Sequence, residues 1–121
     1  MVTATGHTEA IQASRVIGTD VYNTEGRHIG SIEDVMLDKL TNNIMFAVIG
    51  FGGFLGIGEK YHAIPWSSLD YEPGRGGYVV PFSREQLEAA PVYDINELTS
   101  GDGMAARDAS YSYYKVPPYW V

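Results

Sequence analysis

The glycine-rich segment at residues 50 to 58 is the first place in this sequence to look for chemistry. Such loops can bind phosphate groups, because their backbone N–H groups approach the ligand closely. Gly53 and Gly58 have the spacing of a phosphate-binding loop, but Glu59 stands where that loop needs a lysine. A carboxylate would then face the phosphate. We therefore predict a tight connection between strands here, with no nucleotide and no other cofactor.

Carboxylates and histidines do not combine into a recognisable active site. Glu33 and Asp34 are adjacent, so in a strand their side chains point to opposite faces and cannot share a proton. His28 and His62 have no recognised ligand spacing with these carboxylates. No serine lies in a Gly-x-Ser-x-Gly motif, and the chain has no cysteine. We predict no catalytic residue, no metal site and no enzymatic activity.

Large apolar and aromatic side chains gather in segments where binding is the natural expectation. A loop with several large apolar groups must either fold them inward or use them in an interface. Aromatic residues suit interfaces, because they bury a large area while tyrosine and tryptophan keep one polar group. The candidate interaction residues are Phe51, Phe54, Leu55, Ile57, Trp66, Tyr113, Tyr114, Tyr119 and Trp120.

The composition favours one soluble globular domain. With 121 residues, 45% of them hydrophobic and 19% charged, the chain lies in the globular range. A formal net charge of -7 repels a polyanion, so we expect no direct binding of nucleic acid. No stretch is long and apolar enough to span a membrane, and the first residues lack the apolar core of a signal peptide. We expect a cytoplasmic protein.

Short apolar runs between Gly, Asn and Pro turns predict a mainly β domain at residues 14 to 90, after a flexible leader at residues 1 to 13. Strands are expected near residues 16–22, 27–38, 44–49, 61–66 and 78–82. In the second run the alternation slips between Ile32 and Val35, which a β-bulge explains; a helix is the alternative, but the β-branched content and Gly30 argue against it. The unbroken apolar run at 44–49 predicts a strand covered on both faces.

The segment after the last strand contains weaker signals. Ser83 and Gln86 form a capping-box pattern that predicts a short helix ending before Pro91, and Asp94 with Glu97 repeats the pattern weakly. Residues 91 to 121 are expected to be a C-terminal extension. From residue 101 onward no core-building periodicity is present, so we expect an extended aromatic tail. It would bind its own barrel, a sister subunit or an outside partner.

Several stretches together carry a resemblance to a known family. They are Val16-Ile17-Gly18, the run from Gly30 to Asp38, and above all the run from Phe51 to Lys60 followed by Ala63-Ile64-Pro65-Trp66. In these residues, roughly 14 to 90, the chain resembles the PRC-barrel domain family. The resemblance implies a small six-stranded antiparallel β-barrel. The core we expect consists of Val16, Val35, Leu37, Phe46, Val48, Ile64 and Val79.

The resemblance also implies a class of function. Members of the family include the cytoplasmic domain of the photosynthetic reaction-centre H subunit and the C-terminal domain of a ribosome-maturation factor, where the barrel supports assembly of larger complexes. We expect a free-standing member that acts as a non-enzymatic protein-binding and assembly module. It would associate with itself, with a dimer as the favoured state. The alternative is a small-ligand-binding or sensory barrel, and the third possibility is an enzyme without a recognisable motif.

Overall fold

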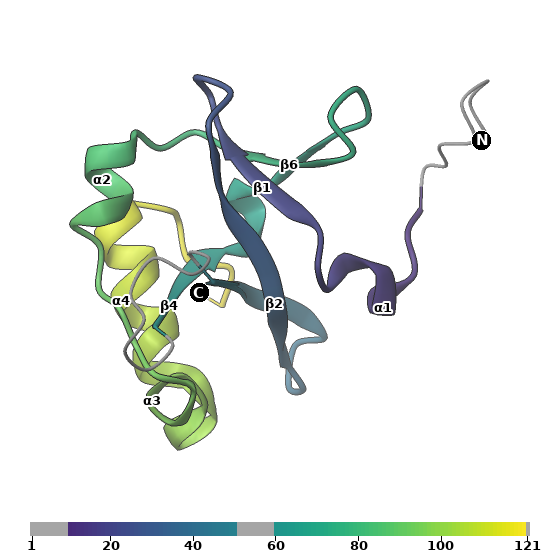
Figure 1. Ribbon diagram of the computed structural model, residues 1–121. Coiled ribbons are helices and arrows are strands. Elements are labelled where there is room, and N and C mark those ends of the chain that lie inside the picture. Colours follow the sequence, from purple (N-terminus) through teal and green to yellow (C-terminus); the bar gives the residue numbers. More distant parts are fainter. Residues whose placement is uncertain (1–9, 51–59, 121) are drawn as a thin grey trace.

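One six-stranded sheet organises the computed structural model, which describes residues 10–50 and 60–120 (Figure 1). The strands are β1 (Asp20–Asn23), β2 (His28–Asp38), β3 (Asn43–Gly50), β4 (Tyr61–Pro65), β5 (Asp70–Glu72) and β6 (Gly77–Val80). The helices are α1 (Ala13–Val16), α2 (Arg84–Glu88), α3 (Ile95–Thr99) and α4 (Met104–Tyr114), with 3-10 turns η1 (Trp66–Ser68) and η2 (Ser100–Gly103). The sheet order is β4-β3-β2-β1-β6-β5. Mainly β architecture is therefore confirmed.

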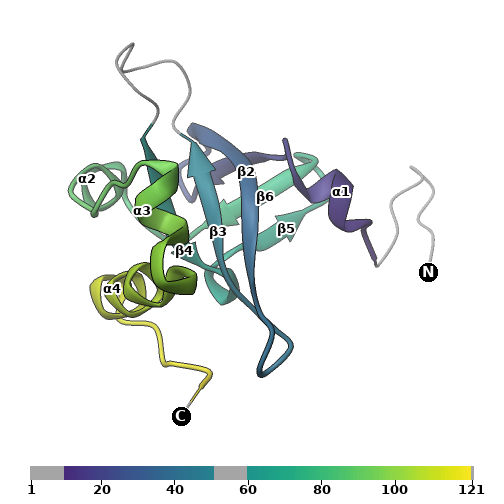
Figure 2. The same cartoon turned by 90° about the horizontal axis from the view of Figure 1, so that it is seen from below.

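The long antiparallel pair β2 and β3 forms the centre of the sheet. The pairing register shifts between Ile32 and Asp34, which confirms the predicted bulge, and shifts again between Met36 and Leu37. From Met45 onward β3 is buried, and its residues contribute to hydrophobic clusters on both faces of the sheet, as predicted. This hairpin is longer than the other strands and projects beyond them (Figure 2).

The prediction of a closed antiparallel barrel is wrong in two respects. β4 and β5 are the two outer strands and do not pair, because the η1 turn between them redirects the chain. β1 pairs with β6 in parallel, through Val21 with Tyr78 and Tyr22 with Val79, so the sheet is mixed. Hairpin turns impose antiparallel pairing on neighbours in the sequence, but no turn dictates the direction of this long-range pair.

The prediction of an extended tail is also wrong, because residues 104 to 114 form the helix α4. Three alanines favour the helix, and its buried positions include Ala106, Ser110 and Tyr114, which lie four residues apart on one face. Lys115 ends the helix in the left-handed conformation at φ 57°, and the Val116 N–H then bonds to the Tyr111 carbonyl at 3.0 Å. Because two of the buried positions hold the small residues Ala106 and Ser110, the sequence shows no hydrophobic periodicity of a helix here.

Two hydrophobic clusters share β3. The inner cluster lies on one face of the sheet and includes Ile32, Ile49 and Ile64. The outer cluster lies between the sheet and the C-terminal helices, where Phe46 and Val48 meet Leu98 of α3 and Ala106 of α4. In Figure 2 α2, α3 and α4 stand on one side of β3 and α1 on the other.

The expected core is partly corrected. Val16, Phe46, Val48 and Ile64 are buried, although Val16 belongs to α1 rather than to the first strand. Val35 and Val79 are half-buried. On β6, Tyr78 and Val80, the neighbours of Val79, are the buried residues. Leu37 is 61% exposed, because it follows the second bulge on the projecting part of the hairpin.

Both predicted helix starts are capped, and the pair before α3 forms a full capping box. Ser83 Oγ accepts a hydrogen bond from the Gln86 N–H at 3.1 Å at the start of α2. Before α3, Asp94 and Glu97 each accept from the other's backbone N–H, at 2.8 and 2.9 Å. These helices bring Leu87 and Leu98 to the two clusters.

Candidate interaction surface

The tip of the β2–β3 hairpin carries the two most exposed large apolar side chains among the described residues. Leu37 is 61% exposed and Leu40 is 89% exposed. The turn is built by Asp38, whose Oδ1 accepts hydrogen bonds from the backbone N–H groups of Leu40 and Thr41 at 3.0 and 3.3 Å. Asn42 adopts the left-handed conformation at φ 64°, which asparagine tolerates. The turn therefore holds an apolar side chain in solvent.

Asp38 also connects the hairpin to the C-terminal segment. Its Oδ2 accepts a hydrogen bond from the Tyr119 hydroxyl at 2.7 Å, and Arg107 Nη1 lies 3.9 Å from the same oxygen. The Tyr119 hydrogen bond is the main reason that the pKa of Asp38 lies below its ordinary value, against the opposing effect of burial. The carboxylate thus stays ionised, and one buried side chain holds both the tip and the C-terminal segment.

Trp120 packs within the chain. The Arg107 guanidinium lies 3.7 Å from the centre of the Trp120 ring, and Tyr111 meets that ring edge-on with centroids 4.9 Å apart. The Tyr111 hydroxyl donates to the Met45 carbonyl of β3 at 2.8 Å. An open hollow beside this group is lined by Asp108, Tyr111, Ser112, Val116, Pro118 and Trp120.

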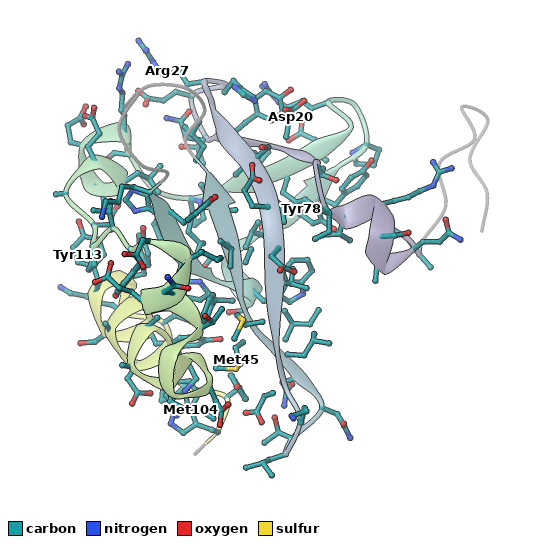
Figure 3. The ribbon with its side chains drawn as sticks, turned by 60° about the horizontal axis from the view of Figure 1, so that its bottom comes forward. Asp20, Arg27, Met45, Tyr78, Met104 and Tyr113 are labelled. Carbon is teal, nitrogen blue, oxygen red and sulfur yellow. The ribbon has the colours of Figure 1, made fainter. Side chains whose placement is uncertain are left out.

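Tyr113 and Tyr114 lie at the end of α4. The Tyr113 hydroxyl donates to the Gln86 carbonyl at 2.6 Å, which ties α4 to α2 (Figure 3). Tyr114 is buried in the inner cluster and stacks on Phe82 with ring centroids 4.2 Å apart. With Tyr119 and Trp120, these predicted interaction residues all make contacts inside their own chain.

Trp66 follows β4 in the chain and begins the η1 turn that leads to β5. It is half-buried, and its ring centroid is 5.6 Å from that of Tyr78. Tyr71 of β5 approaches Tyr78 edge-on at 5.2 Å and is 42% exposed. Asp70 and Glu72 flank Tyr71 and are exposed as well. This part of the molecule therefore combines aromatic rings with carboxylates on an outer strand.

The apolar loop residues predicted to form an interface are Phe51, Phe54, Leu55 and Ile57. They lie outside the residues that the structure describes.

The polar residues weighed for chemistry are dispersed. His28 Nε2 lies 2.9 Å from Asp20 Oδ1, and both side chains are about half exposed, at 55% and 53%. Glu33 and Asp34 are exposed on β2, where Asp34 accepts from the Val35 N–H at 2.8 Å. His62 is buried in β4, and this burial lowers its pKa to about 4. In the described ranges, no three His, Asp or Glu side chains form a group that could hold a metal ion.

No helix within residues 10–50 and 60–120 is long and apolar enough to cross a membrane.

Sequence reasoning missed the hairpin tip and β5 as exposed features. Leu37 follows the alternation of a strand, which predicts burial, and Leu40 lies in a turn whose other residues are polar. That single apolar residue among Asp38, Lys39, Thr41 and Asn42 was the available signal. β5 has three residues, two of them acidic, and is too short to show the alternation by which a strand is recognised in a sequence.

Comparison with known proteins gives one family. The model described as PRC-barrel domain matches residues 8–87, which is more than half of the 121 residues. No curated protein matches the chain.

Proposed function

We propose that this chain, which belongs to the PRC-barrel domain family, is a non-enzymatic protein-binding module that associates with itself and supports assembly. The observation that carries the proposal is the projecting β2–β3 hairpin, which holds Leu37 and Leu40 in solvent at 61% and 89% exposure. Large apolar groups kept in water by a well-bonded turn are typical of a contact surface. The C-terminal aromatic residues, in contrast, are already used inside the chain.

The inner cluster also supports the proposal of protein binding. Side chains from β1, β2, β3, β4 and β6, together with Phe82, Leu87 and Tyr114, are buried against one another there. A domain that binds a small ligand in the mouth of its barrel needs an enclosed apolar pocket with a few convergent polar groups. Described side chains that are buried against one another in this cluster, with exposed apolar side chains at the hairpin tip, fit a protein that binds other proteins through its surface.

A small-ligand or sensory role is the second candidate. The hollow beside α4 favours it, because Tyr111, Val116 and Trp120 offer apolar walls and Asp108 a carboxylate. This hollow is open to solvent, and of its lining residues Val116 alone packs against the inner cluster. We therefore place ligand binding behind protein binding.

The proposal is tested by measuring the molar mass of the full chain by light scattering up to high micromolar concentration. We expect a concentration-dependent dimer. Replacing both tip leucines by serine (Leu37→Ser, Leu40→Ser) should shift the mass to that of a monomer and leave the circular dichroism spectrum unchanged, since both side chains are exposed. A wild-type monomer throughout the range would overturn the proposal of self-association.

A further inference from the structure

The two outer strands of the sheet differ in how well they are covered. The β4 edge is protected, since Tyr61 exchanges two backbone hydrogen bonds with Tyr93 at 2.8 and 2.9 Å. β5 forms the opposite end of the sheet, and its three residues are exposed. In that strand Tyr71 pairs with the inward-facing Tyr78, whereas Asp70 and Glu72 pair with Val79 and Gly77 on the other face. We call Trp66, Asp70, Tyr71 and Glu72 the open edge.

The hairpin tip has complementary chemistry. Between its two exposed leucines lies Lys39, which is exposed too. The tip thus offers apolar groups and a cation, while the open edge offers aromatic rings and two carboxylates. Of the two, Glu72 Oε1 also lies 3.7 Å from Arg75 Nε of its own chain, whereas Asp70 forms no ion pair within the described residues. The tip belongs to the β2–β3 hairpin, whereas the open edge belongs to the β5–β6 hairpin and the η1 turn before it.

The net charge restricts how two copies can meet. At -7 per chain, two copies repel each other unless the contact brings a base of one against acids of the other. A twofold dimer in which each tip docks on the other chain's open edge satisfies this condition twice. An edge-to-edge pairing of two β5 strands does not bring a base against acids. Antiparallel alignment about Tyr71 instead sets Asp70 of one copy against Glu72 of the other.

We propose that the hairpin tip (Leu37, Lys39 and Leu40) docks on the open edge of a second copy of this chain, with Lys39 against Asp70 and Glu72. This proposal rests on the self-association proposed above and names the surfaces that carry it. Because Tyr71 and the two carboxylates lie on opposite faces of β5, the tip straddles this outer strand. Leu40 supplies apolar contact with the Trp66 and Tyr71 rings on one face, and Lys39 reaches the carboxylates on the other and sets the register.

A charge-swap experiment on the full chain tests the pairing. One variant carries Lys39→Glu, and the other carries Asp70→Lys with Glu72→Lys. In each variant alone, tip and edge bear the same sign of charge, so we expect the dimer to be weakened at least about fivefold. In an equimolar mixture, the acidic tip of the first variant matches the basic edge of the second, and the basic tip of the second matches the acidic edge of the first. Native mass spectrometry should then find mixed dimers in excess of either homodimer.

The matched control is Arg84→Glu, which makes the same charge change on α2, and α2 lies on the other side of β3 from β5 (Figure 2). It should leave the dimer unchanged to within about twofold, because distant surface charges are screened. Circular dichroism and melting temperature verify that every variant is folded.

Each outcome is decisive. If the wild type dimerises and neither swap variant weakens it, the tip-to-edge pairing is wrong while self-association stands. If both variants weaken the dimer but the mixture does not restore it, tip and edge do not face each other, and the pairing is again overturned. If the wild type is monomeric at high micromolar concentration, both this proposal and the proposed self-association fail.

Discussion

At the scale of single residues, the buried tyrosines of α4 differ in how their hydroxyl groups are satisfied. Tyr111 donates to the Met45 carbonyl at 2.8 Å, and burial raises its pKa to about 12. The hydroxyl of Tyr114 has no hydrogen-bond partner among the described residues, and burial raises the pKa of this group as well. An unsatisfied buried hydroxyl loses its hydration without compensation, so the two tyrosines should respond oppositely to loss of the oxygen.

We predict that Tyr114→Phe leaves the free energy of unfolding unchanged or raises it by up to about 1 kcal/mol, because no hydrogen bond is lost. Tyr111→Phe should lower it by about 1 to 2 kcal/mol, since the Met45 carbonyl loses its donor. Urea unfolding of the two variants and the wild type measures both changes in the free energy of unfolding. Equal destabilisation by the two substitutions would contradict this assignment.

The buried His62 gives a pH-dependent prediction. Its pKa is about 4 in the folded chain against 6.5 when unfolded, because burial penalises the charged ring. Between these values the unfolded chain binds a proton that the folded chain does not. The free energy of unfolding should therefore fall as the pH is lowered from about 6.5 to about 4, by up to about 3 kcal/mol.

The measurement is urea unfolding at several pH values, compared between wild type and His62→Phe. The difference in slope between the two isolates His62 from the carboxylates that titrate in the same range. His28→Gln is the control, because His28 is about half exposed, at 55%. If His62→Phe follows the wild-type pH dependence, His62 is not the group responsible.

At the scale of elements, α4 covers the outer face of the sheet together with α3. Met104 and Ala106 pack on the cluster that holds Met45, Phe46 and Val48 of β3 (Figure 3). Tyr114, two turns later, belongs to the inner cluster. The C-terminal segment after α4 then reaches the hairpin through the Tyr119–Asp38 hydrogen bond at 2.7 Å. This helix therefore connects both clusters and the tip.

Neighbouring alanines test the docking of α4. Ala106 is 2% exposed, whereas Ala105 is exposed on the same helix. Ala106→Glu should lower the free energy of unfolding by about 2 kcal/mol or more, because a carboxylate would be buried against β3. Ala105→Glu should change it by less than about 0.5 kcal/mol. Thermal and urea unfolding of the pair provide the comparison, and equal stability of the two variants would show that α4 is not docked in this way.

At the scale of the whole molecule, the two clusters are joined by one strand. Ala47 and Ile49 of β3 face the inner cluster, while Phe46 and Val48 face the outer one. A division of the chain into a domain at residues 14 to 90 and a separate extension at 91 to 121 stays a prediction. Shared burial on a central strand favours a single cooperative unit instead.

The two tryptophans allow the cooperativity of unfolding to be measured, because Trp66 lies at the open edge and Trp120 packs beside α4. In Trp66→Phe the fluorescence reports on the C-terminal region, and in Trp120→Phe it reports on the sheet. We expect the urea midpoint from fluorescence to coincide with that from far-ultraviolet circular dichroism in each variant. An earlier fluorescence midpoint in Trp66→Phe alone would instead indicate that the C-terminal region unfolds separately.

The sequence by itself determined the features that depend on near neighbours in the chain. The bulge in β2, the fully covered β3 and the helix caps at Ser83 and Asp94 follow from alternation, β-branched content and side chains that bond three residues away. The family resemblance rests on such local motifs too, and it is confirmed over residues 8–87.

Tertiary structure alone decided the rest. The parallel pairing of β1 with β6, the separation of β4 from β5 and the docking of α4 arise between segments far apart in the sequence. Burial of Ala106 and Ser110 does not register as hydrophobic periodicity, and Leu37 fits a buried strand pattern until the projecting hairpin leaves it in solvent. Burial depends on which surfaces meet, and a local pattern constrains that meeting weakly.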